Sequence, residues 1–316
     1  MTVSSLVDVI HGRLVNHPAI NRVESIRIDA KKVRRGDCFF AFFEHDIERA
    51  VANGAYAVVS TKPKPADDEI AWIAVDEIQD AILLLLRYLL ANRAIRFFHA
   101  DEPLFAIGRA CLGKNRSVAM LESTTFGLME TLLESERITH CIGSDKALLH
   151  TLSPQVEEMH GEAVGEISHS LFEIRMSGFA PLPLPTRLAS FGVGLLTWAK
   201  KEKLEISCDI SGEEGLFFAC YLTRENRFSL RPTARVAIID YPFNDAYISE
   251  SLTYIDENFR WGRREVIRQS DWSDFSELGM IMDKKAFDFI YIEAEDPAGV
   301  LELLKEPAES IESTLF

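Results

Sequence analysis

The feature that most constrains the fold is a regular alternation of short apolar, strand-like runs with helical stretches along nearly the whole chain. Strand-like runs at 95–99, 118–121 and 139–142 have helical patterns between them. Strands that alternate with helices over short connections are typical of βαβ units, in which parallel strands lie side by side. The sequence therefore predicts an α/β protein with adjacent parallel strands across 95–142.

The length of the chain and its element pattern indicate several domains. At roughly 100–200 residues per domain, 316 residues suggest two or three. A first unit of mixed strands and helices closes with a strong helix over 77–92, and new strand–helix series begin near residues 95 and 208. We therefore expect domains at 1–94, 95–207 and 208–316.

The composition excludes several classes of function. The net charge of −15 disfavours nucleic acid as a partner, because phosphate contacts need clustered Lys and Arg. A local basic cluster at 260–268 either holds an anion or, more often, is a solvated helix or loop face. No run reaches the roughly 18 apolar residues of a membrane span, so membrane insertion is not expected. Met1–Val9 lacks the features of a signal peptide.

The five cysteines and eight histidines carry no metal or disulfide signature. No two cysteines form a C-x-x-C pair, and the histidines lack the spacing of metal ligands. Reduced thiols in a cytoplasmic protein without a metal or other cofactor are the expectation.

Two ordered segments near the N-terminus carry a resemblance. The run Ile28-Asp29-Ala30-Lys31-Lys32-Val33-Arg34-Arg35-Gly36-Asp37 leads into the Phe-rich stretch 38–42, and 50–59 follows the pattern Ala-x-x-x-Gly-Ala-x-Ala-Val-Val. Together they resemble the opening motif of the Mur ligases. The likeness is closest to the branch that adds the third residue (meso-diaminopimelate or lysine) and the D-Ala-D-Ala dipeptide to UDP-MurNAc peptides.

A third segment, 238–249, resembles the strand-exit motif of the last Mur ligase domain, with Asp240, Phe243, Asn244 and Ser249 in matching places. The resemblance implies a three-domain α/β fold of the Mur ligase type, here with a reduced central parallel-sheet domain. It also implies candidate substrate-binding residues, which are Asp29, Lys31, Lys32, Asp240, Asn244 and Ser249.

The first domain of these ligases binds the UDP end of a muramyl-peptide substrate. Here Ala30 stands in place of the family's serine and cannot donate a hydroxyl hydrogen bond. Lys31 stands in place of the family's arginine, so the charge is kept but the planar bidentate fork is lost.

The central segment lacks the phosphate-binding loop that ATP use requires. Such a loop needs glycines, whose backbone N–H groups cradle phosphates, and a lysine that reaches the terminal phosphates. The expected position holds His99-Ala100-Asp101-Glu102-Pro103-Leu104-Phe105, which has neither glycine nor lysine. Gly113-Lys114 comes at the end of a predicted helix and precedes a strand, so it is interpreted as a helix end and turn. No catalytic residue and no cofactor site is therefore predicted.

Three functions remain open. The first is a Mur-ligase-like pseudoenzyme of peptidoglycan precursor synthesis, which does not use ATP and acts in binding or assembly. Its partners would be other cell-wall synthesis proteins or a UDP-muramyl precursor. The second is an active ATP-dependent amide-bond ligase with an atypical nucleotide site. The third is a Mur-like fold with no role in the cell wall, since a fold does not determine a function.

Overall fold

A computed structural model describes most of the chain, namely residues 1–91, 93–121, 127, 131–133, 137–159, 167–182, 184, 186–207, 216–260 and 262–305. The chain forms two compact units. The first comprises Met1–Ala100 and Arg116–Glu158, and the second comprises Asp101–Asn115 and Met159–Phe316. The division into three domains at 1–94, 95–207 and 208–316 stays a prediction.

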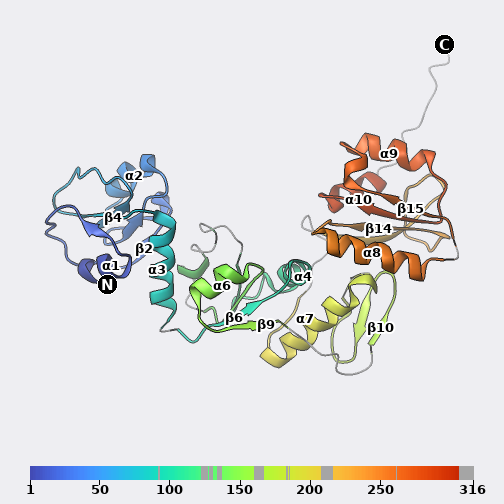
Figure 1. The fold of residues 1–316 in the computed structure, drawn as a ribbon, viewed down its shortest axis with the longest axis horizontal. Coiled ribbons are helices and arrows are strands. Elements are labelled where there is room, and N and C mark those ends of the chain that lie inside the picture. Colours follow the sequence, from blue (N-terminus) through green and yellow to red (C-terminus); the bar gives the residue numbers. More distant parts are fainter. Residues whose placement is uncertain are drawn as a thin grey trace, which may run out of the picture. The chain divides into compact units, whose positions relative to one another are not determined.

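The first unit begins with a five-stranded sheet in the order β1-β5-β4-β3-β2 (Figure 1). The strands are β1 (Arg13–Leu14), β2 (Ile26–Arg27), β3 (Cys38–Phe40), β4 (Ala57–Ser60) and β5 (Ala71–Ala74). β2 to β5 are parallel, and β1 pairs antiparallel with β5. The helical elements are α1 (Val3–Val9), η1 (Ala30–Lys32), η2 (Glu44–Asp46), α2 (Ile47–Ala52) and α3 (Ile78–Leu90).

Both faces of this sheet are buried, because successive side chains on a strand point to opposite faces. Phe40, Val59 and Ile73 belong to a core that includes residues of α1 and α3. Their chain neighbours Phe39 and Val58 belong to a second core that contains residues of η1 and α2. A parallel sheet covered on both faces requires continuous apolar strands, which explains the aromatic run in this part of the sequence.

A second sheet in the first unit is entirely parallel, in the order β7-β8-β6-β9. Its strands are β6 (Arg96–His99), β7 (Val118–Leu121), β8 (His140–Gly143) and β9 (Val156–Glu158). The prediction of adjacent parallel strands across 95–142 is confirmed. Helix α6 (Lys146–Leu152) connects β8 to β9. Most of the helix predicted over 126–134 lies outside the described residues.

The second unit combines a small helical and hairpin part with a C-terminal α/β part. Helix α4 (Glu102–Leu112) packs on α7 (Ala189–Glu202), and η3 (Thr186–Leu188) precedes α7. Strands β10 (Ile167–His169) and β11 (Ile174–Met176) form an antiparallel hairpin.

The C-terminal sheet has the order β13-β12-β14-β16-β15, with β14, β16 and β15 parallel. Its elements are β12 (Phe217–Leu222), β13 (Phe228–Ser229), β14 (Arg235–Asp240), α8 (Asp245–Asn258), β15 (Arg264–Ile267), η4 (Gln269–Asp271), α9 (Phe275–Lys284), β16 (Phe289–Glu293) and α10 (Pro297–Lys305).

Alternation along β14 determines which helices cover this sheet. Val236 and Ile238 share a core with Ile255 of α8, whereas Ala237 and Ile239 share a core with residues of α9 and α10. Figure 1 shows α8 on one face of the sheet and α9 with α10 on the other. The carboxyl ends of β14, β16 and β15 therefore meet at one edge of a doubly covered sheet.

Several sequence expectations need correction. The apolar stripe over 4–15 predicts one helix, but α1 ends at Val9. His11 then has a φ of 52°, and a Cβ on Gly12 would lie 2.7 Å from Ile73. That close approach lets the chain turn directly into β1. Helices α6 and α9 and strands β9 and β15 were not predicted from the sequence; α6, β9 and β15 are short, with seven, three and four residues. Helix α4 ends at Leu112 and Gly113 is its C-cap residue, as predicted.

The expectation of uniformly reduced thiols is also wrong in part, because Cys111 takes part in a disulfide bond. Cys38, Cys141 and Cys220 are free and buried. Burial raises the pKa of the Cys141 and Cys220 thiols to about 12, so these groups are poor nucleophiles at neutral pH. Among the described residues, no helix is long and apolar enough to cross a membrane.

Replacing Leu85 by alanine tests the core around α3. Leu85 is fully buried, and its truncation should lower the free energy of unfolding by about 2–5 kcal/mol. Tyr88 on the same helix is 47% exposed, so Tyr88→Ala should change the free energy of unfolding by less than about 0.5 kcal/mol. Urea denaturation followed by circular dichroism measures both values. Equal effects would contradict the described orientation of α3.

Candidate functional site

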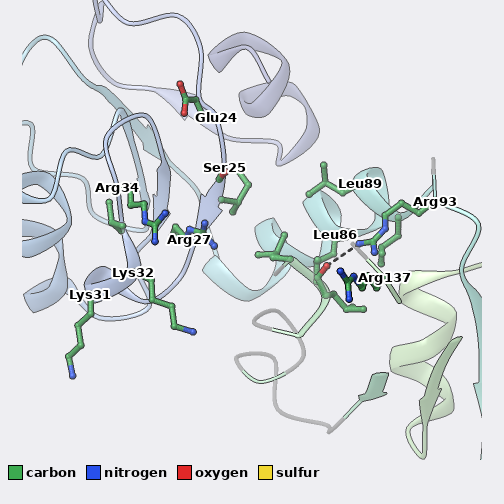
Figure 2. A pocket seen from close by; sticks show the side chains of 15 residues that line it. Glu24, Ser25, Arg27, Lys31, Lys32, Arg34, Leu86, Leu89, Arg93 and Arg137 are labelled. Carbon is green, nitrogen blue, oxygen red and sulfur yellow. Dashed lines mark hydrogen bonds between the residues drawn. The ribbon is translucent and has the colours of Figure 1, made fainter. Parts of the chain in front are cut away.

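A cavity of about 1100 Å³ lies within the first unit and is lined mainly by basic and leucine side chains (Figure 2). On one side the lining comes from β2, η1 and the turn that follows, and on the other from the C-terminal part of α3 and from residues 132, 133 and 137. The basic lining residues are Arg27, Lys31, Lys32, Arg34, Arg93 and Arg137.

The electrostatics of the pocket differ from those of the chain as a whole. The chain carries a net charge of −15, yet among the described lining residues Glu24 supplies the one carboxylate against six basic groups. Arg27 Nε donates to Asp37 at 3.3 Å, and Arg93 donates to the carbonyl of Leu132 at 3.2 Å. Lys31, Arg34 and Arg137 are exposed. Cations gathered in a concave site attract and orient an anion, most strongly one with several charges.

The local backbone explains why these cations converge. Gly36 has a φ of +100°, which favours glycine, and it closes a turn in which the Asp37 carboxylate accepts from the Arg34 amide at 2.9 Å. The carboxylate of Asp29 accepts from the Lys31 amide at 2.8 Å and so caps η1. These two Asp side chains bond to the backbone and to Arg27, and thereby present Lys31, Lys32 and Arg34 at the pocket.

The side of the pocket that holds Arg93 and Arg137 also has an apolar wall. Leu86, Leu89 and Leu90 come from α3, and Leu132 and Leu133 complete the wall. Leu86, Leu90 and Leu132 are themselves buried, so the wall is a packed surface rather than a loose patch. Such a site suits a ligand that combines a charged group with a less polar ring or sugar face.

The predicted substrate-binding residues separate into two groups. Lys31 and Lys32 line the pocket, and Asp29 supports them through its cap. Asp240, Asn244 and Ser249 belong to the second unit. Asp240 ends β14 and Ser249 lies near the start of α8, which confirms the expected strand end and helix start. Whether any of the six binds a substrate stays a prediction.

Sequence reasoning did not single out four basic residues of the pocket. Arg27 and Arg34 flank the motif from which Lys31 and Lys32 were chosen, so the motif's own charge density could have indicated them. Arg93 and Arg137 carry no such signal, because they reach the pocket only after α3 and the second sheet have packed.

Asp240 is a buried carboxylate with three hydroxyl donors. Its Oδ1 accepts from Tyr247 at 2.8 Å, and its Oδ2 accepts from Tyr291 at 3.0 Å and from Ser251 at 3.4 Å. Burial raises the pKa of this carboxyl to about 6, although the hydroxyl donors and nearby Arg187 oppose the shift. Asn244 caps α8 by accepting from the Tyr247 amide at 3.0 Å.

A backbone N–H group at the start of α4 already has a hydrogen-bond partner in a carboxylate of the same segment. Asp101 Oδ1 accepts from the Leu104 amide at 2.9 Å, and Pro103 has no amide hydrogen to offer. Glu102 accepts from the side chain of Asn244 at 3.4 Å. A helix start that binds phosphate presents unoccupied N–H groups, and this one is occupied by a capping carboxylate instead.

A charged cluster lies at the carboxyl edge of the second sheet. His99 ends β6 and its Nδ1 lies 2.7 Å from Glu158 Oε2, while Lys146 Nζ donates to the other oxygen of Glu158. Hydrogen bonds from Lys146 and then His99 lower the pKa of the Glu158 carboxyl to about 2. In the sequence, Glu158 adjoins Glu157 and stands near Glu162 and Glu166, a spacing that predicts a solvated acidic face. Because β9 was not predicted, no pattern placed it beside His99.

Parallel sheets covered by helices make this an α/β protein, and the comparison with solved structures gives its fold as the Mur ligase type. Among solved structures, the chain is similar to a crystal structure of MurF from Acinetobacter baumannii, with a TM-score of 0.52 and 11% sequence identity. The match covers 95% of this chain and 98% of that one. The likeness establishes the fold over nearly the whole chain.

Other matches in the same family score lower. MurF ligase from Thermotoga maritima, solved in complex with ADP, has a TM-score of 0.47 and 15% identity and covers 90% of this chain and 86% of that one. A UDP-N-acetylmuramoyl-L-alanyl-D-glutamate–2,6-diaminopimelate ligase has a TM-score of 0.43 and 13% identity over 98% of this chain and 87% of that one. Neither the family models nor the curated protein sequences contain a match to this chain.

The Glu158 cluster can be tested by titration. The folded pKa of Glu158 is depressed, so the ion pairs are present above the ordinary pKa and are lost as the pH falls towards about 2. Lys146→Met should raise the Glu158 pKa towards its ordinary value, and His99→Gln should raise it by less. Side-chain carbon NMR measures the pKa, with Glu157 as an internal reference. An unchanged Glu158 pKa in Lys146→Met would refute the described contact.

Proposed function

We propose that the protein is a Mur-ligase-like protein of peptidoglycan precursor synthesis that binds a phosphate-bearing UDP-muramyl precursor and does not use ATP. The observation that carries the proposal is the basic pocket of the first unit, which concentrates six cationic side chains in an acidic chain. A nucleotide diphosphate linked to a sugar offers several negative charges together with ring faces for the leucine wall. Arginine and lysine are the side chains that recognise phosphate.

The start of α4 supports a binding role rather than ATP-driven ligation. Asp101 caps the helix, Glu102 adds a second carboxylate, and Pro103 removes a donor. Each carboxylate would repel a phosphate placed there, at a cost on the order of 1 kcal/mol or more once water is partly excluded. A protein of this kind would act by holding its precursor, or by assembling with other cell-wall synthesis proteins in the cytoplasm.

Binding to the pocket can be tested by calorimetry with a UDP-N-acetylmuramyl peptide, with UDP and with pyrophosphate. Arg34→Met combined with Arg137→Met removes one cation from each side of the pocket. The double variant should bind the ligand at least about tenfold more weakly than the wild type, because charged hydrogen bonds contribute roughly 1.5–3 kcal/mol each.

The matched control is Lys62→Met combined with Arg116→Met, which removes the same charge outside the pocket lining. The control should retain nearly wild-type affinity, and binding should weaken as salt is added. An equal loss in the control pair would show that the effect is general electrostatics. Binding of none of the three ligands at millimolar concentration would overturn the proposed ligand.

The absence of ATP use can be tested by thermal denaturation with millimolar Mg-ATP against Mg²⁺ alone. A ligand at about a hundred times its Kd stabilises a fold by roughly 2.7 kcal/mol. In a chain of this size each kcal/mol raises Tm by roughly 2–4 °C. We expect no such rise. A reproducible rise of several degrees would favour the alternative, an active ATP-dependent amide-bond ligase with an atypical nucleotide site.

A further inference from the structure

A buried polar network joins the C-terminal sheet of the second unit to the segment that leads into α7. Asp240 stands at its centre, 2% exposed at the end of β14. Tyr247 and Ser251 of α8 and Tyr291 of β16 donate their hydroxyls to its two oxygens. Burial raises the pKa of both tyrosines, so they remain protonated donors across the physiological range.

Arg187 enters this network from η3, which directly precedes α7. Its Nε donates to Ser251 Oγ at 3.1 Å, and its Nη2 donates to the carbonyl of Tyr247 at 3.2 Å. The guanidinium lies over the Tyr247 ring at 4.5 Å, and the side chain is only 8% exposed. A buried guanidinium needs a nearby negative charge, because an isolated buried charge is costly.

Two carboxylates can supply that charge. Glu250 lies 3.7 Å from Arg187, but its side chain is 71% exposed and the pair is screened by solvent. Asp240 is buried and reaches Arg187 through the shared hydroxyl of Ser251. Glu293, which follows Tyr291 on β16 by two residues, adds negative charge near Tyr291. Asp240 is therefore the counter-charge that decides how firmly Arg187 is held.

We propose that Arg187, Tyr247, Ser251 and Asp240 form a proton-sensitive latch, which fixes the segment of η3 and α7 to the C-terminal α/β part and loosens when Asp240 takes up a proton. Above about pH 6 the carboxylate is ionised and attracts the guanidinium. Below that pH the carboxyl becomes neutral and its attraction for the guanidinium is lost.

The latch and the sheet respond to acid in opposite directions. Since the folded pKa of Asp240 lies above its ordinary value, burial of the charged form costs stability at neutral pH. That cost shrinks as the pH falls below about 6 and is gone near 3.8, the ordinary value of this pKa, so the C-terminal sheet should hold or gain stability while the latch loosens. General acid unfolding would instead weaken both together.

Hydrogen exchange of the full chain at about pH 7.5 and about pH 5, corrected for intrinsic exchange rates, separates these outcomes. We expect the amides of α7 to lose protection by about tenfold at the lower pH, while those of β14 and β16 keep theirs. Arg187→Met should show the low α7 protection at both pH values. The control variant is Arg175→Met, which removes an exposed arginine paired with Glu173 in the same unit. It should lose α7 protection between the two pH values as the wild type does; this pH-dependent loss is called the α7 step.

A second variant keeps the test decisive if Asp240→Asn fails to fold. Tyr247→Phe removes one donor to the charged carboxylate, so it should raise the Asp240 pKa and move the midpoint of the α7 step to higher pH. Asp240→Asn, where it folds, should abolish the step. A wild-type α7 with equal protection at both pH values, or a midpoint unmoved by Tyr247→Phe, would overturn the latch.

Discussion

The packing of α3 against both sheets of the first unit is the interaction on which the pocket depends. Ile78, Ile82 and Leu85 lie in a core that contains strands of the five-stranded sheet and also Phe97, Ala119 and Cys141 of the second sheet. One helix therefore joins two sheets into a single buried core. The same helix supplies Leu86, Leu89 and Leu90 to the pocket wall. Leu86 and Leu90 also belong to that core, so the packing that holds α3 in place also builds the pocket wall.

Positive and negative side chains gather at different places in the two units. The first unit gathers cations at the pocket, while its second sheet places Glu158 between Lys146 and His99 at the carboxyl edge. In the second unit, carboxylates cap the start of α4 and end β14. The carboxyl ends of parallel strands usually receive ligands. Here Glu158 and Asp240, which end β9 and β14 at these edges, hold hydrogen-bond partners within the chain.

The two proposals concern different units and different physics. The pocket is open, cationic and dependent on solvent screening, whereas the Asp240 network is buried and dependent on desolvation. Failure of ligand binding would leave the latch unaffected, and a rigid α7 would leave the pocket unaffected. The Mur ligase fold accommodates both, since a fold supplies positions and individual side chains supply chemistry.

The sequence by itself determined the α/β class, the parallel strands across 95–142 and the strand end at Asp240, because these follow from local periodicity and turn chemistry. It also placed Lys31 and Lys32 in a motif whose Asp29 and Gly36 shape the backbone within a few residues. Only the tertiary structure brought Arg93 and Arg137 to the same cavity, set Glu158 beside His99, and placed Arg187 near Asp240. Each of these pairings joins residues far apart in sequence. Their proximity is determined by which apolar faces pack together, and no local pattern records that.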